Sequence, residues 1–128
     1  MDRRTEKHVQ SEVIQALSCL PHSLVWRQAS GTYILPGNKS PGRITVGKVG
    51  MADVAAIIGG HSYQFEVKWK HRQTKAQREW AALVERAGGT YVVVRSWEQA
   101  VKVVYGDSEE AAQWIDTINK RLPMLSQS

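Results

Sequence analysis

Residues 50–68, GMADVAAIIGGHSYQFEVK, contain the stretch that decides the fold of this chain. An apolar run from Asp53 to Ile58 is followed by glycine-rich turn residues and by an alternating run from Tyr63 to Lys70, as in a β-hairpin. In the second run, polar side chains that include Glu66 and Lys68 share the face opposite the aromatic and aliphatic ones. The stretch therefore predicts a half-buried pair of strands with a charged face.

The register of this hairpin determines which charged side chains meet. If Ile58 pairs with Tyr63, Asp53 lies opposite Lys68, and Glu66 is diagonal to Asp53 at roughly 7–8 Å between backbones. Two carboxylates at that separation can share a divalent cation. Taken alone, an acid and a lysine on an exposed sheet face usually form only a solvated ion pair, worth at most about 1 kcal/mol. A metal site therefore requires further polar residues aimed at the same place.

Two such residues are expected from helices. Glu12 lies beside the apolar stripe of a first helix, predicted from Thr5 to Leu20, so it faces inward or borders the stripe. Gln77 opens a second helix, predicted from Lys75 to Ala87. The buried stripe of that helix is expected to consist of Trp80, Leu83, Val84 and Ala87. Structural alternatives remain open for both: Glu12 as an ordinary boundary glutamate, and Gln77 as the end of a Thr-x-x-Gln capping box.

The other elements follow from periodicity and turn residues. Strands are expected at residues 24–28, 32–35, 44–46 and 90–95, and two more helices begin at the signals Ser96-x-x-Gln99 and Asp107-x-x-Glu110. The order predicts an α/β fold with a mixed central β-sheet flanked by helices. We expect one domain, residues 1–122, followed by a flexible C-terminal tail, residues 123–128.

The charge of the chain suggests a polyanionic partner. It has 128 residues, 42% of them hydrophobic, and a formal net charge of +5. Basic residues gather in two stretches, one before the apolar run and one around the proposed site. The residues expected to hold DNA phosphates are Lys39, Arg43, Lys48, Lys70, Arg72, Lys75 and Arg78. Salt would weaken such binding steeply; a solubilising surface is the alternative.

Several other classes of function are disfavoured. One cysteine, Cys19, excludes an internal disulfide and a cysteine-based zinc site, and favours a reducing compartment, most simply the cytoplasm. No apolar run approaches the roughly 18 residues of a membrane span. The run GRITVGK at residues 42–48 resembles a phosphate-binding loop, but Val49 replaces the hydroxyl residue that would hold magnesium. The histidines lack metal-ligand spacing.

Taken in order, the selected residues resemble the VRR-NUC domain family of the PD-(D/E)XK nuclease superfamily, in its stand-alone phage or bacterial type. The resemblance is carried by Glu12, Gly50-Met51-Ala52-Asp53, Glu66-Val67-Lys68, Gln77, residues 88–96 and, upstream, residues 26–31. Ala52 replaces the proline that precedes the aspartate in the superfamily, and nothing after Ser96 carries the match. The resemblance implies a restriction-endonuclease-like core.

The resemblance also implies an activity. This is the metal-dependent, structure-selective hydrolysis of phosphodiester bonds in branched or duplex DNA, with Holliday junction resolution by a homodimer as the leading expectation. Nicking of duplex or supercoiled DNA is an alternative, and so is a non-catalytic DNA-binding module of a repair or replication complex. The expected location is the cytoplasm of a bacterium or of a phage-infected host cell.

Roles for individual residues follow from the same resemblance. Mg²⁺ or Mn²⁺ would be held by Asp53, Glu66, the Val67 carbonyl and Glu12. Lys68 would orient the attacking water and stabilise the developing charge, and Gln77 would fix Lys68 or that water. The further candidates for contact with phosphate are Arg95, Ser96, Arg27 and Ser30.

Overall fold

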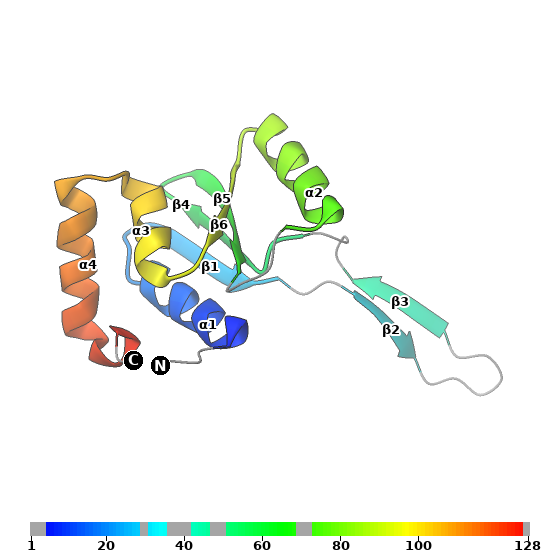
Figure 1. Cartoon of the computed structure of the whole chain (residues 1–128), viewed down its shortest axis with the longest axis horizontal. Helices are drawn as coiled ribbons and strands as arrows, with labels where there is room; N and C mark the ends of the chain where they lie inside the picture. Colours follow the sequence, from blue (N-terminus) through cyan, green and yellow to red (C-terminus); the bar gives the residue numbers. More distant parts are fainter. Residues whose placement is uncertain (1–4, 29–30, 36–41, 47–50, 69–72, 127–128) are drawn as a thin grey trace.

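The computed structural model describes residues 5–28, 31–35, 42–46, 51–68 and 73–126, with only the backbone of 31–35 and 42–46. A four-stranded sheet lies at the centre (Figure 1). In spatial order its strands are β1 (Ser23–Arg27), β4 (Val54–Ile58), β5 (His61–Val67) and β6 (Thr90–Val94). The first two pairings are antiparallel and the third is parallel. The prediction of a mixed central sheet is therefore confirmed.

The other two strands form a separate sheet. These strands, β2 (Gly31–Leu35) and β3 (Gly42–Val46), pair antiparallel with each other. Figure 1 draws this hairpin beside the four-stranded sheet rather than within it. The strands predicted at residues 32–35 and 44–46 are present, but they do not widen the central sheet.

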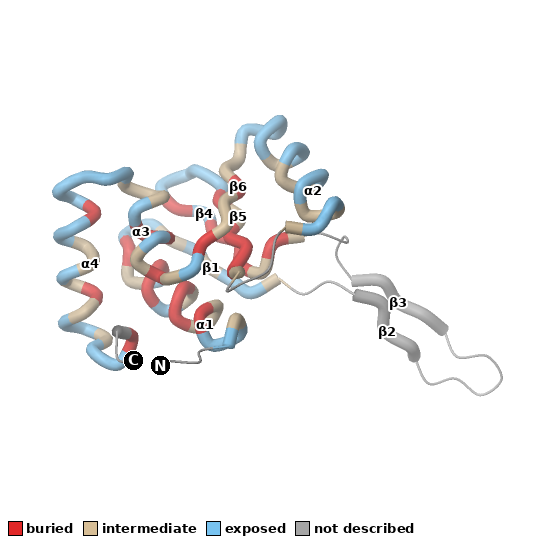
Figure 2. The backbone as a smooth tube through the Cα atoms, in the orientation of Figure 1, coloured by how far each residue is buried: buried red, intermediate tan, exposed pale blue. Residues whose placement is uncertain are grey.

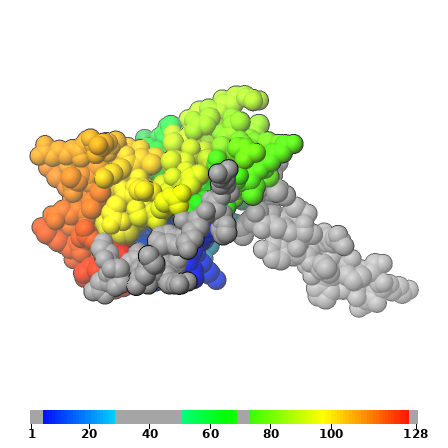
Figure 3. All heavy atoms as spheres, in the orientation of Figure 1, coloured from blue at the N-terminus to red at the C-terminus, as the bar shows by residue number. Residues whose placement is uncertain are grey.

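Helices cover the central sheet unequally. On one face, α1 (Glu6–Leu17) contacts β4 and β5, and α3 (Trp97–Tyr105) contacts α1 and β6. Outside them, α4 (Glu109–Arg121) packs on α3, and the two form a continuous surface away from α2 (Figure 3). On the opposite face, α2 (Lys75–Arg86) lies against β6. None of the helices in the described ranges is long and apolar enough to cross a membrane.

One hydrophobic core lies between the sheet and the pair α1–α3. It contains Val13, Phe65 and Trp97, each at most 1% exposed. In contrast, α2 has no buried residue (Figure 2), and Leu83 is 47% exposed. The prediction of a buried stripe on α2 is therefore wrong. The reason is that α2 rests on the polar face of β5, which offers side-chain hydrogen bonds instead of an apolar surface.

The hairpin register differs from the prediction by two residues. Gly59 and Gly60 have φ angles of 57° and 85°, and they alone form the turn, so Ile58 pairs with His61. Two consecutive residues with positive φ make the tight turn whose twist matches that of antiparallel strands. Extended by one residue, this register places Asp53 opposite Glu66, and the predicted pairing of Asp53 with Lys68 is wrong.

The C-terminal residues are part of the fold. Residues Pro123–Ser126 form a 3-10 helix, η1, that packs on α4. The side chain of Leu125 is 2% exposed and belongs to the hydrophobic core. The prediction of a flexible tail is therefore wrong for residues 123–126; residues 127–128 lie outside the described ranges. Burial of the Leu125 side chain explains why this short segment is packed on the domain.

This packing gives a prediction on stability. Leu125→Ala is expected to lower the free energy of unfolding by about 2–5 kcal/mol, because it leaves a cavity in the core. Met124→Ala is the matched control, since the Met124 side chain is 65% exposed, and it should cost less than about 0.5 kcal/mol. Urea unfolding followed by tryptophan fluorescence measures both. Equal, small effects would contradict the packing of η1.

Candidate active site

Asp53 and Glu66 form the centre of the candidate site. Asp53 immediately precedes β4, and Glu66 lies on the face of β5 that α2 covers. The Val67 amide donates a hydrogen bond of 2.8 Å to Asp53 Oδ2. This bond fixes the Asp53 carboxylate against the strand that carries Glu66. Two acids from neighbouring strands are thereby brought face to face.

Glu66 is held on one oxygen only. Its side chain is buried, and Oε2 accepts a hydrogen bond of 2.9 Å from Gln77 Nε2 and lies 3.7 Å from Lys68 Nζ. The other oxygen, Oε1, is buried and has no hydrogen-bond donor among the described residues. When Glu66 is ionised, a buried carboxylate oxygen without a donor is costly. A cation bound at Oε1 would remove that cost.

The surroundings of Glu66 disfavour its charge. Burial, then the charge of Asp53, then a hydrogen bond shared with the Asp53 carboxyl raise the pKa of Glu66 from 4.5 to about 8, although Lys68 lowers it. Near neutral pH the metal-free pair therefore retains a proton on Glu66. Two close acids that cannot both ionise in isolation can do so around a cation. The electrostatics of the pair thus suit a metal site.

The raised pKa predicts how stability depends on pH. Because the folded state binds the Glu66 proton more tightly than the unfolded chain, its stabilising effect is complete below about pH 4.5 and is lost as pH rises to about 8. In EDTA, the Tm of Glu66→Gln should exceed that of the wild type by several degrees at pH 8.5, and the difference should shrink toward pH 5. Thermal unfolding at four pH values tests this. Parallel curves would contradict it.

Gln77 satisfies both interpretations of its sequence context. Its Oε1 accepts from the Thr74 amide at 2.9 Å, and its own amide donates to Thr74 Oγ1 at 3.1 Å, so the capping box is formed. Its Nε2 is left to hold Glu66. The described contact is thus with a carboxylate, and the role of Gln77 toward Lys68 or the attacking water stays a prediction. The helix cap makes Gln77 a rigid donor to Glu66.

The first helix carries two acids that bear on the site, Glu12 and Glu6. Glu12 is 4% exposed, so its inward position is confirmed. Within the described ranges, no group of three or more His, Cys, Asp or Glu side chains is placed to hold a metal ion, and the role of Glu12 as a ligand stays a prediction. The charge of Glu6 contributes to the raised pKa of Glu66. Glu6 begins α1, six residues, or about 9 Å of helix, before Glu12.

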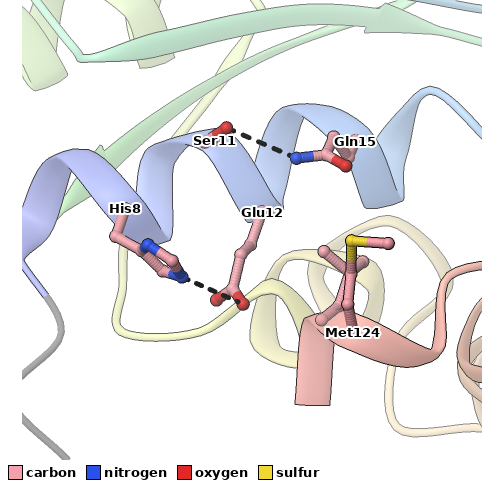
Figure 4. Close-up of a pocket in the computed structure, with 6 residues that line it drawn as sticks. His8, Ser11, Glu12, Gln15 and Met124 are labelled. Atoms are coloured by element: carbon pink, nitrogen blue, oxygen red, sulfur yellow. Dashed lines mark hydrogen bonds and ion pairs between the residues drawn. The ribbon is translucent and has the colours of Figure 1, made fainter. Parts of the chain in front are cut away.

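Glu12 lies in a separate pocket between α1 and η1 (Figure 4). The His8 imidazole points toward the Glu12 carboxylate, with 3.8 Å between Nε2 and Oε2. Ser11 and Gln15 are joined by a hydrogen bond on the same helix, and Met124 faces them from η1. Two ionisable groups one helical turn apart form an ion pair when His8 is protonated.

The residues expected to contact DNA are only partly described. Lys75 and Arg78 lie exposed in the first turns of α2, beside Gln77. Arg27 and Arg95 are exposed at the ends of β1 and β6, and Ser96 caps α3 by accepting a hydrogen bond from the Gln99 amide. The expected residues whose side chains lie outside the description are Ser30, Lys39, Arg43, Lys48, Lys70 and Arg72. Contact with DNA remains a prediction for all of them.

Several residues on the site face were not anticipated from sequence. Gln64 Oε1 accepts hydrogen bonds from Trp80 Nε1 and from Gln28 Nε2, both at 3.0 Å. Tyr91 pairs with Gln64, is 8% exposed, and has its pKa raised to about 12 by burial and by the charge of Glu66. Tyr91 therefore remains protonated beside the acids. The alternation in β5 predicts that Gln64 lies on the same face as Glu66, but no sequence pattern predicts its hydrogen-bond partners.

The donor set fits a hard divalent ion. It offers two carboxylates, one of them with a buried oxygen that lacks a donor. Ions such as Mg²⁺ and Mn²⁺ prefer carboxylate and carbonyl oxygens and retain several waters. Two carboxylates from adjacent strands can therefore supply enough protein ligands for such an ion, with water molecules as the remaining ligands.

Comparisons with known proteins support the fold. The structure is similar to a solved "VRR_NUC domain", with a TM-score of 0.54 and 20% sequence identity, over 80% of this chain and 97% of that one. No family model matches the chain, and neither does any curated protein. The chain therefore has the restriction-endonuclease-like fold of a VRR-NUC domain, as the order of its residues predicted.

Proposed function

We propose that this chain, which has the fold of a VRR-NUC domain, is a metal-dependent endonuclease that hydrolyses phosphodiester bonds in DNA. The observation that carries the proposal is the Asp53–Glu66 pair, in which Glu66 is buried with one oxygen lacking a donor. A protein that only binds DNA has no use for two carboxylates at a surface that holds phosphates, because they would repel the ligand. A cation removes that repulsion.

Each residue of the candidate site has a distinct role in the proposed reaction. Asp53 and Glu66, with the Val67 carbonyl, bind Mg²⁺ or Mn²⁺. When bound, such an ion polarises the scissile phosphate and lowers the pKa of water. Lys68, held 3.7 Å from Glu66 Oε2, stabilises negative charge that develops on the phosphate. Gln77 orients Glu66 from the capped start of α2.

The proposed substrate is branched DNA, and first of all a four-way junction. The net charge of +5 and the exposed Lys75 and Arg78 beside Gln77 support binding of a polyanion. A junction has two-fold symmetry, and a homodimer would present two such sites with the same symmetry. Duplex nicking is the alternative activity, and the two make different predictions for the same assay.

The test is cleavage of a labelled four-way junction beside matched duplex and single strands, with Mg²⁺, Mn²⁺ or EDTA. Symmetric, metal-dependent nicks in the junction alone would support resolution by a dimer. Equal cutting of plain duplex would favour a nickase. Tight binding without cleavage in either metal would overturn the proposal in favour of a DNA-binding module. Sedimentation that shows only monomer at micromolar concentration would remove the dimer.

A paired substitution tests which acid of α1 serves the site. Glu6→Gln is expected to lower metal-dependent cleavage by roughly tenfold or more, because it removes a third negative charge, close enough to act on Glu66, that would help to attract a divalent cation. Glu12→Gln removes an equal charge from the same helix and should change cleavage less than about twofold. Cleavage rates are compared across a Mn²⁺ titration. The reverse order of effects would restore the original assignment of Glu12.

A further inference from the structure

Gln28 makes two hydrogen bonds to the backbone around Asp53 and a third to Gln64. It directly follows β1, and its backbone amide donates to the Asp53 carbonyl at 2.8 Å. Its side-chain Nε2 donates to the Ala52 carbonyl at 3.1 Å. The same nitrogen donates to Gln64 Oε1 at 3.0 Å. Gln28 thus continues the hydrogen bonding between the two chain segments beyond the end of β1, to the residues that precede β4.

These bonds fix the backbone on both sides of Asp53. The Ala52 carbonyl belongs to the peptide before Asp53, and the Asp53 carbonyl belongs to the peptide after it, so both dihedral angles of Asp53 are restrained by one residue. The Val67 amide restrains the carboxylate itself. Ala52 is 1% exposed, so its carbonyl has no access to water as a substitute partner. The Gln28 side chain therefore holds the peptide that precedes Asp53 in place.

The network continues from Gln28 to the second helix. Gln64 Oε1 accepts from Gln28 and also from Trp80 Nε1 of α2, at 3.0 Å. The same helix holds Glu66 through Gln77. Because α2 has no buried residue, we expect these polar contacts to contribute strongly to holding the helix against the sheet. The segments that carry the two carboxylates are consequently linked through α2, which contacts Gln64 through Trp80 and Glu66 through Gln77.

We propose that Gln28 is a positioning residue that holds Asp53 in place for metal binding. In this proposal, Gln64 and Trp80 link the segment that contains Asp53 to helix α2. The inference rests on the proposed function of Asp53 as a metal ligand. Hydrogen-bonding partners behind a ligand typically change metal affinity by about 10–100-fold when they are removed. A residue with only a structural role would instead lower the thermal stability without a selective change at Asp53.

The experiment has one readout with metal and one without. Gln28→Met retains the length of the side chain but has no donor. It is expected to weaken Mn²⁺ binding, measured by calorimetry, by about 10–100-fold. In EDTA it should speed hydrogen exchange of the Val67 amide, whose acceptor is Asp53 Oδ2. Trp80→Phe, which removes one donor from the far end of the network, should act in the same direction with a smaller factor. Trp114→Phe on α4 is the control and should change neither.

The outcomes separate this inference from the proposed function. If the wild type and Asp53→Asn bind Mn²⁺ equally, the assignment of Asp53 as a ligand fails, whereas the Val67 exchange still reports on Gln28. If Asp53→Asn loses binding but Gln28→Met keeps wild-type affinity and wild-type Val67 exchange, the role of Gln28 is overturned and the nuclease site stands. A lower Tm in Gln28→Met with unchanged affinity and exchange would also overturn it.

Discussion

Glu66→Gln is expected to reduce DNA cleavage by roughly 10³-fold or more, because it removes the charge of a metal ligand whose ion supplies several kcal/mol of transition-state stabilisation. The substitution keeps the shape of the side chain and an oxygen that can accept from Gln77. Binding of DNA in EDTA should be unchanged near neutral pH, where metal-free Glu66 already carries a proton, and tighter above about pH 8, where the substitution removes a negative charge. Loss of activity and retention of affinity are thus expected together.

A matched control shows whether the effect belongs to the site. Glu79→Gln removes an equal charge from α2, but its side chain is 66% exposed and lies 3.9 Å from Lys75 rather than at the acids. Cleavage of a labelled junction and fluorescence anisotropy in EDTA are measured for both variants. If Glu66→Gln loses affinity and cleavage together with thermal stability, Glu66 has a folding role. Cleavage at the wild-type rate would remove Glu66 from the mechanism.

The convergence of the polar residues could be predicted even though the register could not. Predicted and observed pairings of the hairpin differ by two residues, and a shift of two keeps every side chain on its face. Asp53, Glu66 and Lys68 were therefore placed on the correct face with the wrong direct neighbours. The error arose at Gly59 and Gly60, because the sequence allows both a two-residue and a four-residue turn.

The helical contributions were harder to predict for a different reason. Periodicity indicates which side of a helix is buried, but it does not indicate which end of the helix lies beside a site on the sheet. Periodicity therefore indicates Glu12, on the stripe of α1, and gives no signal for Glu6, whose charge at the start of the helix acts on Glu66. Gln77 could be placed because a capping box fixes its position at a helix start.

Contacts between a side chain and backbone carbonyls produce no sequence pattern from which they could be predicted. Gln28 binds the carbonyls of Ala52 and Asp53, which any residue would offer, so neither partner could be recognised from its side chain. Similarly, Leu125 lies in the four-residue segment Pro123–Ser126, which is too short for a hydrophobic period to appear. Such contacts depend on the assembled tertiary structure, and only the structure could supply them.

Lys68 should be the second site of large effect. Lys68→Met is expected to lower the cleavage rate by about 10²–10³-fold, because it removes a cation positioned where charge develops on the phosphate. Its side chain is 12% exposed and its Nζ lies 3.7 Å from Glu66 Oε2, so the charge acts where little solvent screens it. Affinity for Mn²⁺ should fall much less, since both proposed carboxylate ligands remain.

The same substitution should also displace the pH dependence of cleavage. The charge of Lys68 lowers the pKa of Glu66, so its removal raises that pKa further above its present value of about 8. Because metal binding requires the ionised carboxylate, the residual activity of Lys68→Met should rise at a higher pH than that of the wild type. Lys75→Met is the control: its side chain is 84% exposed, so it should weaken DNA binding in a salt-dependent way and leave the pH profile in place. A profile unchanged in Lys68→Met would mean that the lysine charge does not reach Glu66 in the working site, and its role would then be confined to the phosphate.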